Sequence, residues 1–217
     1  MHHACDRDSR SAAIPLLLAH PDIDVNVKDT LGYTPFLFAC CGYAPCVRLL
    51  LKDSRVKVNE PANDGRTPLW CAAIGGQLDI IKWWIASERE MDLGTPGDSK
   101  TDAIWVAKSQ GATEVVTLLE RFKSDAAKTR HAVRMELGFL DDLAAEMFAL
   151  VVFVSDRLLQ INDATTPSAT ARFFSIARTL PLELQVVLCH RLVGSAKEII
   201  PSKDSEVAFK ELARRLW

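Results

Sequence analysis

Apolar side chains in the first half of the chain recur at helical spacing in short blocks, and glycines separate the blocks. The clearest block follows Gly76, where apolar residues return every three or four positions. Spacing of this kind predicts an amphipathic helix that buries one face. The residues expected on that face are Leu78, Ile80, Ile81, Trp84 and Ile85.

The chain repeats itself with a period of 33 residues. Thr34-Pro35 and Thr67-Pro68 each begin a short run that leads to an alanine and then a glycine. Asp64-Gly65 predicts a turn before the second run, because glycine tolerates a positive φ. Thr67 is placed to cap a helix, and Pro68 suits its first position, where no backbone donor is needed. Self-similarity at this period predicts helical pairs that stack on one another.

These features resemble the ankyrin repeat, and the resemblance covers about residues 10–123. It implies an all-α solenoid of one partial and three full repeats with short β-hairpin loops. The expected region is residues 1–124, with repeats at about 1–27, 28–60, 61–94 and 95–124.

Two departures from the ankyrin pattern stand out. Asp102-Ala103 replaces the threonine-proline opening of the last repeat, and the loop before it, Gly94 to Lys100, is longer than usual. The histidine usual at the fourth position of that motif is replaced by Leu37, Trp70 and Trp105. These replacements predict more apolar contacts between repeats than the family pattern implies.

The first residues fit the same family only in part. His2 to Cys5 resembles the middle of a first ankyrin helix whose threonine-proline opening is missing. One explanation is that the chain begins inside a repeat of a longer array. The other is an irregular end repeat, which such arrays commonly have.

The second half predicts a different helical region, residues 125–217, with about five helices. Phe139–Ile161 is expected to be one long helix at the centre of a bundle, because Met147 to Val154 is apolar all round. Thr166-Pro167 is expected to begin the next helix. Pro181 begins another, with Leu184, Val187, Leu188 and Leu192 on one face, and Ser202 or Asp204 caps the last. The region could cap the last repeat or stand as a bundle.

A short segment in this region has a second interpretation. Leu180 to Leu184, followed by Leu188 and Leu192, is similar to the opening of an F-box, a helical adaptor for ubiquitin ligases. That resemblance, over residues 180–217, implies that Leu180, Pro181 and Leu184 would face the ligase's linker subunit. A buried helix start explains the same residues, and the sequence favours that explanation.

Composition excludes several classes of function. A net charge of -2 argues against nucleic-acid binding, which needs a basic surface. The longest apolar run is far below the ~20 residues that span a bilayer, so no membrane association is expected. The six cysteines have no pattern of a small secreted framework. Reduced thiols in a cytoplasmic or nuclear protein are therefore expected.

The sequence contains no arrangement typical of an enzyme, and we expect no catalytic residue, cofactor or metal. Cys40, Cys41 and Cys46 lack a second pair of zinc ligands. Cys189 and His190 are adjacent, which directs them about 100° apart on a helix. A polar pocket in the C-terminal region would revive an enzymatic hypothesis. The residues expected to line it are Glu146, Arg172, Arg178 and His190.

The resemblance implies a non-enzymatic module that binds another protein, of unknown identity, through hairpin tips and the concave face of the first helices. The oligomeric state is not specified. Aromatic and arginine side chains are the usual anchors of such interfaces. Mapping this surface onto the sequence predicts Tyr33, Phe38, Arg66, Cys71, Ile74, Gln77, Trp105, Val106 and Gln110. Phe38 and Trp105 could instead pack against a neighbouring helix, and Trp83-Trp84 are expected in the core.

Overall fold

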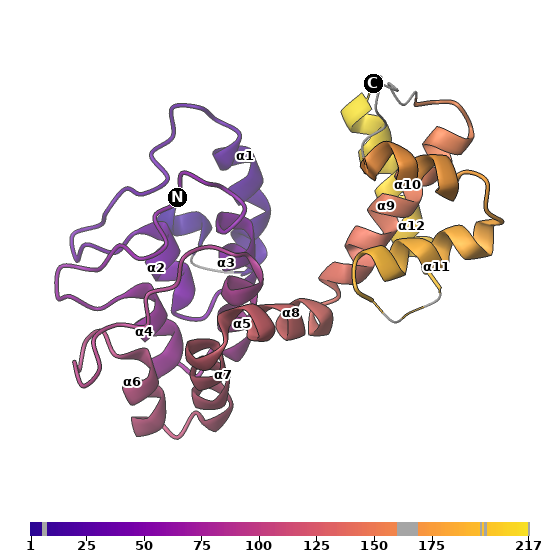
Figure 1. Ribbon diagram of the computed structural model, residues 1–217. Helices are drawn as coiled ribbons and strands as arrows, with labels where there is room; N and C mark the ends of the chain where they lie inside the picture. Colours follow the sequence, from indigo (N-terminus) through magenta and orange to yellow (C-terminus); the bar gives the residue numbers. More distant parts are fainter. Residues whose placement is uncertain (6–7, 160–168, 196, 198, 217) are drawn as a thin grey trace. The chain divides into compact units, whose positions relative to one another are not determined.

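The computed structural model describes residues 1–5, 8–159, 169–195, 197 and 199–216 (Figure 1). The chain divides into two compact units, Met1–Val133 and Arg134–Trp217. In the described residues every regular element is a helix, which confirms the predicted all-α class. None of these helices combines the length and the apolar character that crossing a bilayer requires.

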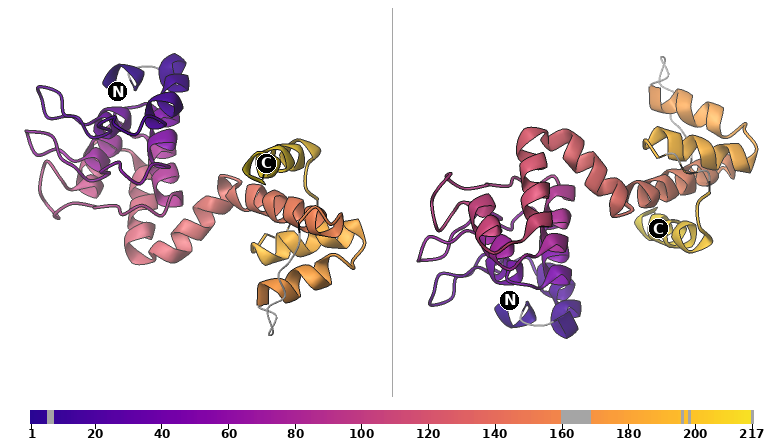
Figure 2. Two further views of the ribbon diagram at one scale, coloured as in Figure 1. Left: turned by 90° about the horizontal axis from the view of Figure 1, so that it is seen from above. Right: turned by 90° about the horizontal axis from the view of Figure 1, so that it is seen from below.

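The N-terminal unit is built from two layers of helices (Figure 1). One layer contains α2 (Pro35–Cys40), α4 (Pro68–Ile74) and α6 (Ala103–Ser109), which pack side by side. The other contains α1 (Ile14–Leu18), α3 (Ala44–Leu50), α5 (Leu78–Ala86) and α7 (Thr113–Ser124). Two 3₁₀ helices, η1 (His2–Ala4) and η2 (Asp8–Ala13), precede them. Both views of Figure 2 show the connecting turns projecting from one side of the stack.

Each helix of the first layer begins at a side chain that caps it. The hydroxyl Oγ1 of Thr34 accepts a hydrogen bond from the Leu37 N–H, and that of Thr67 accepts one from the Trp70 N–H. In the last repeat Asp102 Oδ1 accepts from the Trp105 N–H at 2.9 Å. An aspartate is as good a cap as threonine. Although Asp102-Ala103 replaces the threonine-proline opening, α6 therefore still begins at a capping side chain.

The turns between repeats are hydrogen-bonded loops. The Asp29 N–H donates to the Tyr33 carbonyl and the Ala62 N–H donates to the Arg66 carbonyl, which closes each loop. Gly32 has a φ of 80°, and a Cβ there would lie 2.6 Å from the Asn63 nitrogen of the next loop. Only glycine fits at this contact, so the turn glycine also sets the spacing between loops.

Three arginines connect the ends of second-layer helices to the next repeat. Arg55 donates to the Leu18 carbonyl at 2.7 Å, and Arg89 donates to the Asp53 carbonyl at 2.8 Å. Arg130 donates to the Ile85 carbonyl at 3.2 Å. The last carbonyls of a helix have no partner within it. The Leu18 and Ile85 carbonyls are such groups, at the ends of α1 and α5, whereas the Asp53 carbonyl, after α3, also accepts from the Val56 N–H. These arginine links were not predicted from the sequence.

The core lies between the two layers. Trp84 is fully buried and meets Phe36 edge to face, with ring centroids 5.0 Å apart. Trp83 is half-buried and carries the Arg48 guanidinium over its ring. Of the residues that replace the usual histidine, Leu37 and Trp70 are buried. The predicted apolar contacts therefore form at these two positions, whereas Trp105 is exposed.

The C-terminal unit is arranged around one helix, as predicted. After α8 (Ala126–Glu136), in which the boundary between the units falls, α9 (Phe139–Ser155) packs against three further helices. These are α10 (Ala169–Ala177), α11 (Leu182–Leu192) and α12 (Ser202–Leu216). Phe148 and Val151 of α9 form a core with Ala177 and Cys189. This agrees with the apolar character of Met147 to Val154.

The predicted end of the central helix is wrong. The helix was expected to reach Ile161, but α9 ends at Ser155. Arg157 has a φ of 60°, and the Leu158 N–H donates to the Phe153 carbonyl in the turn that follows. No glycine or proline marks this end in the sequence. The predicted cap at Thr166-Pro167 lies outside the described residues.

The predicted buried face of α11 is also wrong in part. Leu184 and Leu192 are 51% and 53% exposed, whereas Gln185, Cys189 and His190 are buried. Apolar residues occur on all sides of this helix, so their spacing does not select one face. Contact with α9 selects it instead. The start of α11 is therefore not the buried helix start that the sequence favoured.

Candidate functional site

The predicted surface residues come from the first-layer helices and the turns before them. Ile74 is 38% exposed, Trp105 is 47% exposed and Gln110 is exposed. Cys71 and Val106 are 5% and 2% exposed, so they belong to the core and are not available to a partner. We call the remaining set the first-helix face: Tyr33, Phe38, Arg66, Ile74, Gln77, Trp105 and Gln110.

An aromatic cluster forms one end of this face. Phe38 stacks on Tyr43 with ring centroids 5.9 Å apart and planes 5° apart. The ring of His2 meets Phe38 edge-on, and His2 Nε2 donates to the Tyr33 carbonyl at 2.7 Å. Phe38 is therefore half-buried and held in one position. Sequence reasoning missed His2 and Tyr43, because His2 reaches the cluster only through the fold.

Arg66 is held in place from two sides. Its guanidinium forms an ion pair with Asp64 and lies over the Trp70 ring, 5.6 Å from the centroid. The hydrogen bond from Arg66 lowers the pKa of the Asp64 carboxyl. Trp70 Nε1 is buried without a hydrogen-bond partner. The arginine thus has a fixed orientation before any partner arrives, which reduces the entropy that binding would cost.

Four side chains at the boundary between the second and third repeats affect one another's pKa values. They are Tyr33, Cys41, Arg66 and Cys71. Burial raises the pKa of the Tyr33 hydroxyl, and the charge of Arg66 opposes that rise. The Cys41 thiol donates to the Leu37 carbonyl at 3.6 Å, and interaction with Cys71 lowers the pKa of Cys41. Cys41 is exposed beside these residues but was not among the predicted ones. Its position at the end of α2, just before Gly42, was the available indication.

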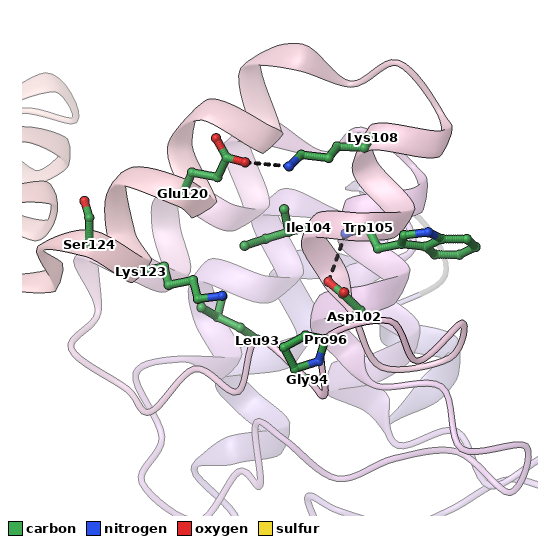
Figure 3. Close-up of a pocket in the computed structure, with 10 residues that line it drawn as sticks. All are labelled: Leu93, Gly94, Pro96, Asp102, Ile104, Trp105, Lys108, Glu120, Lys123 and Ser124. Carbon is green, nitrogen blue, oxygen red and sulfur yellow. Dashed lines mark hydrogen bonds and ion pairs between the residues drawn. The ribbon is translucent and has the colours of Figure 1, made fainter.

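The last repeat contains a pocket of about 460 Å³ (Figure 3). Lys108 of α6 pairs with Glu120 of α7 at 2.7 Å across its edge. Ile104 points toward the side chains of α7, whereas Trp105 points away from them (Figure 3). Sequence reasoning found only Trp105 here. The pocket is lined by Leu93, Gly94, Pro96, Asp102, Ile104, Trp105, Lys108, Glu120, Lys123 and Ser124.

Asp102 links this pocket to the long loop before it. Its carboxylate accepts a hydrogen bond from the Gly97 N–H at 2.8 Å, besides capping α6. Burial alone would raise the pKa of Asp102, but the bonds from backbone N–H groups lower it overall. The loop is therefore tied to the helix start, and the pocket wall is ordered.

Of the described residues named for an enzymatic hypothesis, three are exposed and one is buried. Glu146, Arg172 and Arg178 are exposed, whereas His190 is buried and donates through Nε2 to the Ile199 carbonyl. One pocket of the C-terminal unit has other walls, namely Met135, Leu140, Asp141, Ser195 and Lys197. In the described part of the chain no three His, Cys, Asp or Glu side chains form a group suited to a metal.

Comparison with known proteins identifies the repeats. A family model described as ankyrin repeats, in three copies, matches residues 1–95. Two similar proteins are the SMC5-SMC6 complex localization factor protein 1 of Bos taurus and of Homo sapiens. They are 30% identical over 148 and 146 residues, 64% of this chain and 14% of each relative.

A third relative is the transient receptor potential channel pyrexia of Drosophila melanogaster. It is 30% identical over 110 residues, which cover 50% of this chain and 11% of the relative. The chain thus spans a small fraction of the length of these curated relatives. Beyond residue 95, α6 and α7 continue both helical layers. Residues 1–95 of this chain are ankyrin repeats, a module for protein-protein interaction.

Proposed function

We propose that the first-helix face binds another protein and that the chain acts without catalysis of its own. The observation that carries the proposal is the state of its exposed anchors. Arg66 is oriented by Asp64 and Trp70, and Trp105 is half exposed on the rim of an ordered pocket. Tryptophan and arginine dominate the energetics of most protein interfaces. Ordered side chains of these types on one face support a recognition surface.

The compartment follows as part of the same proposal. All six cysteines are thiols in the structure, and five of them lie in the N-terminal unit. We infer a reducing compartment, the cytoplasm or the nucleus, in which such thiols persist.

The experiment is a quantitative affinity capture from a lysate of the source organism, read by mass spectrometry. It compares the intact chain with the double variant Arg66→Ala, Trp105→Ala. A matched control, Lys52→Ala, removes an exposed side chain just after α3 in the other layer. We expect a partner that the intact chain and the control recover equally and that the double variant loses at least about tenfold. Equal recovery by all three would refute the assignment of the face.

A second candidate function is that of a substrate adaptor for a ubiquitin ligase. The exposure of Pro181 and Leu184 supports it, because an F-box-like segment must offer these residues to a linker subunit. Binding of the purified linker subunit to the intact chain, and its loss in Leu184→Ala, would support the adaptor. Absence of binding to the intact chain would exclude this function and leave the first-helix face unaffected.

A further inference from the structure

The pocket of the last repeat lies at the α6 end of the first-helix face. Helix α6 packs against α4 and α7 packs against α5, and Figure 3 shows the pocket on the side of α6 and α7 that faces away from these earlier helices. Its volume of about 460 Å³ is in the range of ligand sites in proteins. Trp105, which lines the pocket, also belongs to the first-helix face. A segment bound along that face therefore reaches the pocket at Trp105.

One wall of the pocket is the long loop before α6, and hydrogen bonds hold this loop in place. The Thr95 N–H donates to Thr101 Oγ1 at 3.2 Å, and the Gly97 N–H donates to Asp102 Oδ2 at 2.8 Å. Gly94 has a φ of 82°, and a Cβ there would overlap the Thr101 carbonyl oxygen. The wall is thus fixed before a ligand arrives, which reduces the entropy that binding costs. The extra length of this loop over the repeat pattern therefore forms part of a binding site.

Apolar side chains from the loop and from α6 line part of the pocket. Leu93 and Pro96 come from the loop, and Ile104 and Trp105 come from α6. Leu93 and Ile104 are half-buried, and Trp105 is 47% exposed. Removal of apolar surface from water is the main favourable term in most protein association. These residues therefore favour a ligand with a large apolar side chain.

The charged residues of the pocket differ in their contacts. Lys108 and Glu120 form an ion pair at 2.7 Å, and both carboxylate oxygens of Asp102 accept backbone N–H groups. Lys123 is exposed, and within the described residues its ammonium has no carboxylate at ion-pair distance. A cationic ligand would thus meet two carboxylates that already have partners. An anionic ligand would meet the ammonium of Lys123.

We propose that this pocket binds an acidic segment of a partner protein, in which an aspartate or glutamate lies next to a large apolar residue. The apolar side chain packs against Ile104 and the loop, and the carboxylate pairs with the Lys123 ammonium. The inference rests on the proposed function, because Trp105 belongs to both surfaces, and it adds the chemistry of the partner. An ion pair at an exposed lysine contributes little free energy. Affinity therefore comes mainly from the apolar side chain, and the lysine selects the acidic residue.

The test begins with a phage-displayed library of random dodecapeptides, selected on the intact chain. We expect enrichment of peptides in which an acidic residue lies next to a large apolar residue. A fluorescent copy of the most enriched peptide is then titrated with the intact chain, and its anisotropy is measured at low and at high salt. The affinity should fall as salt rises, because salt screens an exposed ion pair.

Matched variants then locate the bound peptide. Lys123→Ala should weaken binding by roughly two- to fivefold, and Trp105→Ala should weaken it by at least about tenfold. The control Lys128→Ala removes an exposed positive charge from α8, outside the pocket lining, and should bind like the intact chain. A peptide whose acidic residue is replaced by lysine should bind Lys123→Glu more tightly than it binds the intact chain, because opposite charges then meet again. Circular dichroism establishes that each variant folds.

Two results would overturn the inference. One is a selection that enriches no peptide, or only peptides without an acidic residue. The other is a peptide whose affinity is the same for the intact chain, Lys123→Ala and Lys123→Glu. If Arg66→Ala loses such a peptide, recognition lies elsewhere on the first-helix face, so this inference fails while the proposed function stands.

Discussion

The two units satisfy their buried polar groups in different ways. In the N-terminal unit, side-chain caps and arginines recur with the repeat. Each cap accepts from an N–H three residues later, and each arginine donates to a carbonyl about one repeat earlier. In the C-terminal unit, Gln185 Oε1 and His190 Nδ1 are buried without hydrogen-bond partners. Trp70 Nε1 is an exception in the N-terminal unit. In the N-terminal unit the repeat thus supplies hydrogen-bond partners at regular positions. In the C-terminal unit the partners of buried polar groups depend on how the helices pack.

The largest effect is expected in the core of the N-terminal unit. Trp84→Ala removes a fully buried ring and its hydrogen bond to the Glu90 carbonyl, and should cost about 3–5 kcal/mol of unfolding free energy. The neighbouring Trp83→Ala should cost roughly 1–2 kcal/mol, because that ring is half-buried. Urea denaturation measures both. Equal costs would mean that the assignment of the core is incorrect.

The next largest effect is expected at the arginines that link neighbouring repeats. Arg89→Ala removes the side-chain donor to the Asp53 and Val56 carbonyls, of which the Asp53 carbonyl keeps the Val56 N–H as a donor, and should cost about 2 kcal/mol. The control Arg121→Ala removes an exposed arginine from α7 and should change stability by less than about 0.5 kcal/mol. Thermal unfolding followed by circular dichroism compares them. A loss in Arg89→Ala no larger than in the control contradicts a structural role for these links.

Alkaline pH should weaken the N-terminal unit through its buried thiols. The pKa of Cys5 is about 12 in the folded state, whereas an unfolded thiol ionises near ~8.5. Between these values the folded state binds more protons than the unfolded state. Stability therefore falls as pH rises, by up to about 1.4 kcal/mol per pH unit.

Melting temperatures between pH 7 and pH 10.5 test this loss. Cys5→Ala should reduce the slope. Cys41→Ala should not, because the folded-state pKa of Cys41 is lowered, so the ionisation of this thiol adds stability as pH rises. A slope that Cys5→Ala leaves unchanged would mean that other groups cause the alkaline loss.

The smallest expected difference in unfolding free energy is between variants on the buried and the exposed face of α11. Leu188 packs against the core around Phe148 and Val151, whereas Leu184 is half exposed. Leu188→Ala should therefore lower the unfolding free energy by roughly 1 kcal/mol more than Leu184→Ala. Urea denaturation of both variants measures the difference. A greater loss in Leu184→Ala would restore the face that the apolar spacing predicted.

Sequence alone could predict most of the repeat architecture, since its determinants are local. The caps at Thr34 and Thr67 are readable because each lies three residues before the N–H that it accepts from. The burial of Cys71 and Val106 is not readable in this way. Helix α4 packs against α2, α5 and α6, so only a narrow strip of it stays exposed. The width of that strip depends on neighbours that no local pattern specifies.

Dependence on residues distant in sequence also explains why the contacts of Arg55 and His2 were not predicted. Arg55 reaches the end of a helix 37 residues earlier, and His2 reaches a carbonyl 31 residues later. No short motif records such contacts. For α11, the sequence predicts the helix but not its buried face, because apolar residues surround it. Whether the C-terminal helices cover the last repeat stays a prediction.

Site-specific photo-crosslinking tests the central claim most directly. A photoreactive amino acid at Ile74, on the first-helix face, is compared with the same group at Lys52, in the other layer. Both chains are activated in the lysate of the source organism, and crosslinked proteins are identified by mass spectrometry. The account predicts one partner joined at Ile74 and absent at Lys52. Crosslinks to that partner only from Lys52 would contradict recognition by the first-helix face.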